Sequence, residues 1–179
     1  MNKQTRFTAH GVKLALIAMA IAATGNTMAA NNATATANST VVAPIAVSKA
    51  VDLSFGSIAG GASAGTVTLT PGGTRTVGGG TVAAGGTPAA AQFDVTGAGN
   101  LTYAIDMTGT ASTLTSGSDS MAFAAISDTS ASAKTSGTVT TGTLSNGAQS
   151  IYVGGILTVG ANQNAGTYSG DIVVAVNYN

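Results

Sequence analysis

The chain has 179 residues, of which only 7% are charged and 4% aromatic, with six basic residues, six acidic residues and no cysteine. Without cysteine the fold has no disulfide framework, and without a basic surplus we expect no nucleic-acid partner. All six acids are aspartates and the single histidine is His10, so we expect no metal site and no cofactor.

The first thirty residues have the pattern of a secretory signal peptide. Lys3, Arg6 and Lys13 form a basic region, residues 14–23 form a short apolar core, and residues 27–30 offer small side chains for cleavage. A bilayer span needs about 20 apolar residues, so an uncleaved membrane anchor is the weaker alternative. We therefore expect an exported protein with no membrane span after cleavage. Its residues 31–179 carry three basic against six acidic side chains, a net charge of −3.

The mature chain would begin with a flexible arm. Residues 31–40 alternate alanine with threonine or asparagine and contain no large side chain. Residues 41–48 then predict a strand, which Pro44 interrupts. Because proline donates no ladder hydrogen bond, this is expected to be an edge strand. One face of it carries Val41, Ala43, Ile45 and Val47.

Alternation with a period of two predicts a series of further short strands. They cover residues 51–55, 66–70, 74–77, 92–96, 101–107, 120–126, 138–144, 149–159 and 166–179. Asn146-Gly147 is a hairpin turn signal, and Gly154-Gly155 predicts a bulge. No helical period follows residue 30. The sequence therefore predicts an all-β fold, a single domain over residues 31–179 built as an immunoglobulin-like antiparallel β-sandwich of about 8–10 short strands.

The motifs that resemble catalytic sites lack partners. Residues 61–65 match the G-x-S-x-G pattern around Ser63, but no helix follows and no histidine remains after residue 30 to act as base. Asp94, Asp106 and Asp171 are expected on the outer faces of strands, where they protect sheet edges. A calcium site made from two or three aspartates is the alternative, although no D-x-D-x-D-G spacing supports it. We expect no enzymatic activity.

Three other features have simpler explanations than function. Glycosylation sequons begin at Asn32, Asn38 and Asn100, but such triplets are frequent in sequence rich in asparagine and threonine. The tyrosines offer a sugar-stacking surface in principle. Tyr103 and the two tyrosines of residues 166–179 fall on inward faces, so we expect core packing instead.

Three stretches resemble the DUF4402 family of exported bacterial proteins, with the likeness covering about residues 33–179. They are residues 52–58 (DLSFGSI), 152–161 (YVGGILTVGA) and 165–178 (AGTYSGDIVVAVNY). The first and last also resemble chaperone–usher pilins and spore-coat-U-type subunits, which have an early FG strand and a closing G-x-Y-x-G…V-x-Y strand. The chain lacks the disulfide that many such pilins carry.

The resemblance implies a structural or adhesive surface subunit of a Gram-negative bacterium, at home in the periplasm, on the cell surface or outside the cell. Such subunits associate through sheet edges, and a periplasmic chaperone is an expected partner. The candidate strand-exchange segment is Val41, Ala43, Ile45 and Val47. The alanines of the arm alone bury little surface at ~25 cal/mol per Å². Two alternatives remain: the segment pairs within its own domain, or the protein is a monomeric secreted module that binds a glycan or partner through residues 71–91 and 109–120.

Overall fold

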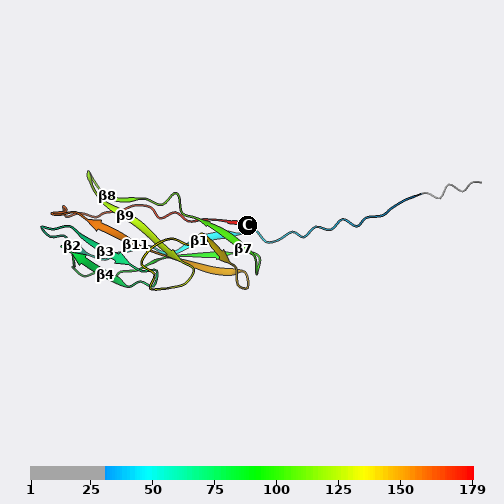
Figure 1. Cartoon of the computed structure of the whole chain (residues 1–179), viewed down its shortest axis with the longest axis horizontal. Helices are drawn as coiled ribbons and strands as arrows, with labels where there is room; N and C mark the ends of the chain where they lie inside the picture. The colour runs from blue at the N-terminus through cyan, green and yellow to red at the C-terminus, as the bar shows by residue number, and fades with distance from the viewer. Residues whose placement is uncertain (1–30) are drawn as a thin grey trace, which may run out of the picture. The chain divides into compact units, whose positions relative to one another are not determined.

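A computed structural model describes residues 31–179 (Figure 1). The predicted signal peptide, residues 1–30, lies outside the described residues. Within residues 31–179, one structural unit runs from Thr40 to Asn179, and residues 31–39 do not belong to it. Residues 31–45 carry no regular secondary structure and, apart from Ile45, are exposed.

Between residues 31 and 179 the chain contains strands and no helix, so no described segment is a candidate for a helical membrane span. The strands are β1 (Ala46–Val51), β2 (Ile58–Ala59), β3 (Gly65–Leu69), β4 (Arg75–Gly79), β5 (Val82–Ala83), β6 (Ala91–Thr96), β7 (Thr102–Asp106), β8 (Thr113–Ser116), β9 (Asp119–Asp128), β10 (Thr141–Thr143), β11 (Ala148–Val159) and β12 (Ala175–Tyr178).

All strand pairs are antiparallel, and β11 is the centre of the large sheet. Its first half pairs with β6, its second half pairs with β3 on the same side, and β9 pairs along its opposite edge. β1 lies outside β6, β4 outside β3, and β8 outside β9. A second sheet has the order β10-β7-β12, and β2 pairs with β5. Ile151 and Val153 of β11 are fully buried, because they share a core cluster with Tyr103 and Ile105 of the second sheet.

The core consists of two clusters. The first contains Phe55, Val67, Leu69, Leu114, Met121, Phe123, Leu157 and Val159. The second contains Ala91, Phe93, Val95, Tyr103, Ile105, Leu144, Ile151 and Val153. Since the second cluster draws side chains from the large sheet and from β7 of the second sheet, the two sheets pack face to face. The predicted all-β sandwich is confirmed.

The predicted turn at residues 146–147 agrees with the structure, whereas the predicted limits of the first strand do not. Asn146 and Gly147 both have positive φ, 52° and 85°, in the tight turn before β11, which confirms the predicted turn. The flanking strands β10 and β11 belong to different sheets, so the turn does not join a hairpin. The strand predicted over residues 41–48 was placed too early, because the ladder begins only at Ala46, after Pro44. From Ala46 to Val51 the strand pairs with β6 along one edge.

The bulge predicted at Gly154-Gly155 was wrong. β11 runs through both glycines, and its pairing with β9 keeps one register from Tyr152 to Thr158. These positions are glycine because a side chain has no room. A Cβ at residue 154 would collide with the carbonyl oxygen of Leu69, and one at residue 155 would collide with the ring of Phe123.

The closing strand is shorter than the predicted residues 166–179, because only Ala175–Tyr178 form a continuous ladder, with β7. Before it, Ser169 exchanges two backbone hydrogen bonds with Thr115, of 2.9 and 3.0 Å. The carbonyl of Asp171 accepts a third from the N–H of Ala111 at 2.9 Å. The closing chain therefore runs first along β8 and then along β7, with interruptions, and we call residues 165–178 the closing segment.

Candidate functional site

A cleft of about 740 Å³ opens between residues 53–58, which we call the first wall, and residues 165–172, which we call the second wall. Leu114, Met121 and Leu157 of the first core cluster lie at its base. All the residues that line the cleft are uncharged. The cleft is therefore an opening into the core of the sandwich, lined by apolar side chains, hydroxyls and main chain.

The first wall is paired along only one edge. Ser54 exchanges two hydrogen bonds of 2.8 Å with Ala89, and Ser57 accepts from the N–H of Ala84 at 2.9 Å. The N–H groups of Leu53 and Phe55, which alternate with Ser54, make no backbone hydrogen bond within residues 31–179. In an extended chain alternate residues direct their N–H and C=O groups to opposite edges. The N–H groups on this edge of the first wall are thus unpaired, whereas the carbonyl oxygen of Phe55 accepts a hydrogen bond from Arg75.

Arg75, at the start of β4, fixes the position of the first wall. Its Nη1 donates to the carbonyl oxygens of Phe55 at 2.6 Å, Gly85 at 3.2 Å and Ser57 at 3.3 Å. Gly56 makes this possible, because it has φ +69° and any Cβ there would lie against the guanidinium. One cation thus clamps three carbonyls where the chain bends, and it holds the wall against the large sheet.

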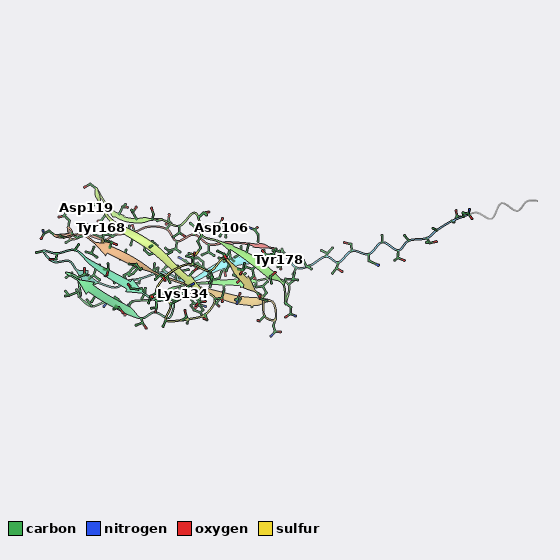
Figure 2. All side chains as sticks on the ribbon, viewed as in Figure 1. Asp106, Asp119, Lys134, Tyr168 and Tyr178 are labelled. Carbon is green, nitrogen blue, oxygen red and sulfur yellow. The ribbon has the colours of Figure 1, made fainter. Side chains whose placement is uncertain are left out.

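The second wall has the same one-sided pairing. Its odd positions, Ser169 and Asp171, bond to β8 and the loop before it. Its even positions, Tyr168, Gly170 and Ile172, make no backbone hydrogen bond in the described chain. The Tyr168 hydroxyl accepts from Gln163 Nε2 and donates to the carbonyl of Asn164, both at 2.8 Å, which ties down the start of the wall (Figure 2).

Half-buried apolar side chains line the cleft at Leu53, Ile58, Tyr168 and Ile172 and continue beyond it along the same two chain segments, against the second core cluster. They are Ile45, Val47, Leu53 and Ile58 on one side and Tyr168, Ile172, Val174, Val176 and Tyr178 on the other. Inward side chains of the central strands, by contrast, are fully buried. We call this line of half-buried side chains the seam. Within residues 31–179, β12 pairs only with β7, and no strand pairs with the even positions of the second wall.

The seam is closed at one end by Tyr178. The Tyr178 hydroxyl donates to the carbonyl of Ala43 at 2.9 Å and accepts from the N–H of Ala98 at 2.6 Å. Ala43 therefore lies at the Tyr178 end, whereas the first wall lies beside residues 165–172 at the other end. The two sides of the seam run in opposite directions.

The predicted strand-exchange segment is divided between exposed and packed residues. Val41 is 95% exposed and Ala43 is exposed. Ile45 and Val47 are half-buried and pack against the second core cluster of their own domain. Exchange of this segment stays a prediction. Its second half, Ile45 and Val47, is held in its own domain by packing against the second core cluster.

The other candidate residues are placed as follows. Ser63 is exposed in a loop. Within residues 31–179 no three His, Cys, Asp or Glu side chains come together. Hydrogen bonds from Gln92 and Ser150 lower the pKa of Asp94, and hydrogen bonds from Thr108 lower the pKa of Asp106. These carboxylates take part in local hydrogen bonding at strand surfaces.

Tyr103 is a core residue, as predicted. It is fully buried, its hydroxyl donates to Gln149 Oε1 at 2.7 Å, and burial raises its pKa. A second, more open cleft of about 410 Å³ lies beside Ile105 and Phe123. Sequence reasoning missed both the cleft at the seam and the clamp by Arg75. The one available signal was Gly56 in the FG pair, since a glycine that ends a strand often marks a bend.

Comparison with known proteins gives a family and no further relative. No curated protein matches the sequence, and no solved structure does. Residues 45–178 match a family described as a domain of unknown function. The match begins at Ile45 and ends at Tyr178, so it includes both sides of the seam. This match spans more than half of the sequence, and the chain belongs to the DUF4402 family.

Proposed function

We propose that this protein is an exported, non-enzymatic structural subunit that assembles on the cell surface or in the extracellular matrix by β-strand pairing. The observation that carries the proposal is the seam, with its cleft, its half-buried apolar side chains and its unpaired backbone groups. In this function the cleft accepts one strand, which completes the sandwich.

Strand addition draws on two sources of free energy that the cleft offers together. The unpaired N–H and C=O groups of the second wall and the unpaired N–H groups of Leu53 and Phe55 supply main-chain hydrogen bonds, and the opening to the core accepts alternate side chains. Natural proteins usually protect such edges with lysine, proline or a bulge. The walls contain no lysine and no proline, so the edges remain available. Before assembly the same edges invite aggregation, and we assign their protection to a periplasmic chaperone.

Light scattering coupled to size-exclusion chromatography tests the proposal. We expect residues 31–179 to form oligomers whose size increases with concentration. A matched variant, residues 40–179, retains the whole structural unit that begins at Thr40 and loses only chain outside it. Circular dichroism verifies that this variant stays folded. A concentration-independent monomer of the longer protein would contradict assembly and would favour the alternative of a secreted binding module.

A further inference from the structure

We infer that the strand accepted by the cleft comes from a second copy of this chain, that it is residues 33–41, and that it inserts antiparallel to the closing segment. We call residues 33–41 the donor stretch. This inference rests on the proposed function and identifies the partner in it.

The donor stretch has the right length and is available. Residues 31–45 pair with no strand in the described structure. At ~3.3 Å per residue, the nine residues of the donor stretch extend over about 30 Å, which exceeds the ~26 Å of the eight residues in the second wall. Ile45 and Val47 remain packed in the donor's own domain. The donor stretch can therefore fill a neighbour's cleft without unfolding its own sandwich.

The side chains of the donor stretch are compatible with the cleft. Its odd positions carry Ala33, Ala35, Ala37, Ser39 and Val41, and its even positions carry Thr34, Thr36, Asn38 and Thr40. A strand directs these two sets to opposite faces. The alanines of the odd positions bury little apolar surface, so main-chain hydrogen bonds supply most of the binding free energy of the inserted strand. No charge lies in the donor stretch or the cleft lining, so assembly desolvates no ion.

The orientation follows from the longer unpaired edge. The three alternate residues Tyr168, Gly170 and Ile172 all have unpaired backbone groups on one edge, whereas the first wall bends at Gly56. Antiparallel pairing is slightly more stable per residue than parallel pairing, and it is the more common arrangement. We therefore expect the antiparallel ladder to form with the second wall.

This orientation decides the form of the assembly. With antiparallel insertion, Val41 of the donor lies at the cleft end of the acceptor's seam. The donor's own seam begins with Ala43 at its Tyr178 end. Unlike ends of two copies then meet, which is a heterologous contact, so the chain of contacts does not close and a head-to-tail polymer grows. Parallel insertion would bring like ends together and permit a closed dimer.

Paired cysteines test the donor, the partner and the orientation. The chain has no cysteine of its own, so every disulfide is an introduced one. Outward even positions of the donor stretch face outward odd positions of the second wall. Antiparallel insertion pairs Asn38→Cys with Thr167→Cys and Thr34→Cys with Asp171→Cys in one register. Parallel insertion pairs Thr34→Cys with Thr167→Cys and Asn38→Cys with Asp171→Cys instead. Thr36→Cys against either wall position covers a register shifted by two residues.

We expect the antiparallel pairs, oxidised in the full mature chain, to give a ladder of disulfide-linked oligomers that collapses to monomer on reduction. Closed dimers from the parallel pairs would overturn the orientation. Disulfides within one chain would overturn the second copy as partner. If the unmodified chain assembles but no pair crosslinks, a different strand fills the cleft, and the proposed function survives without this inference. If the unmodified chain stays monomeric, both fail.

Discussion

The clamp by Arg75 provides the most specific prediction about the first wall. Arg75→Met retains much of the apolar stem but removes the guanidinium from the carbonyls of Phe55, Ser57 and Gly85. A hydrogen bond from a charged donor contributes about 1.5–3 kcal/mol. The 2.6 Å bond to Phe55 is partly buried, so we assign it the full contribution to the free energy of unfolding. The two longer bonds are exposed and contribute little. We expect the free energy of unfolding to fall by about 2–3 kcal/mol.

Urea unfolding of the mature chain at one fixed protein concentration measures this change, with the slope of free energy against urea unaltered. Lys49→Met is the matched control. Lys49 Nζ lies 2.6 Å from Asp52, but the two side chains are 56% and 79% exposed, so the loss should stay below about 1 kcal/mol. Equal losses in the two variants would refute the argument that Arg75 holds the wall.

Three further predictions concern packing, pH and the donor stretch. Gly154→Ala should destabilise the domain by about 2 kcal/mol or more, because the new Cβ would collide with the carbonyl oxygen of Leu69. In the control Gly78→Ala the new Cβ lies an ordinary 3.6 Å from Thr66 Oγ1, so the free energy of unfolding in urea should change by less than about 1 kcal/mol. The lowered pKa of Asp94 adds stability that is present above the unfolded value of about 3.9 and is lost as the pH falls through the lower folded value; Asp94→Asn should flatten stability against pH below about 4. Ala35→Asp should abolish oligomers in light scattering because it places a charge in the cleft, and Thr36→Asp on the outer face should not; equal behaviour of the two would contradict the assigned face.

The fold could be predicted from the sequence wherever one side chain in two is buried. Phe93 and Val95 in β6, and Ile151 and Val153 in β11, alternate with less buried residues and lie in the core as their period requires. The Asn146-Gly147 turn was equally predictable, because few residue pairs adopt two positive φ angles.

Strand limits and glycine roles were less predictable, since they depend on contacts distant in sequence. The period of two in the closing segment is real, with its even positions other than Gly166 and Gly170 half-buried, but it does not reveal which residues find a ladder partner. Gly154 and Gly155 resembled a bulge because glycine weakens any strand. Their actual reason, the approach of Leu69 and Phe123, involves strands far away in the chain.

The candidate site could be predicted only in part. Only the end of the proposed donor stretch was predicted, because the strand-exchange segment expected from the sequence began at Val41 and residues 31–40 were expected to be a flexible arm. The acceptor was not predicted, because an unpaired edge is a property of the assembled sheets, and Leu53 and Ile172 look like ordinary core residues in sequence. Arg75 gave no signal either, since its partners are backbone carbonyls.

Hydrogen–deuterium exchange of peptides that cover the second wall tests the central claim most directly. In the assembled mature chain, the N–H groups of Tyr168, Gly170 and Ile172 should bond to an added strand and exchange slowly. In residues 40–179, which lack most of the donor stretch, they should exchange fast, while peptides from β11 stay protected in both. Equal exchange of the second wall in the two proteins would mean that no strand enters the cleft, and it would contradict the account.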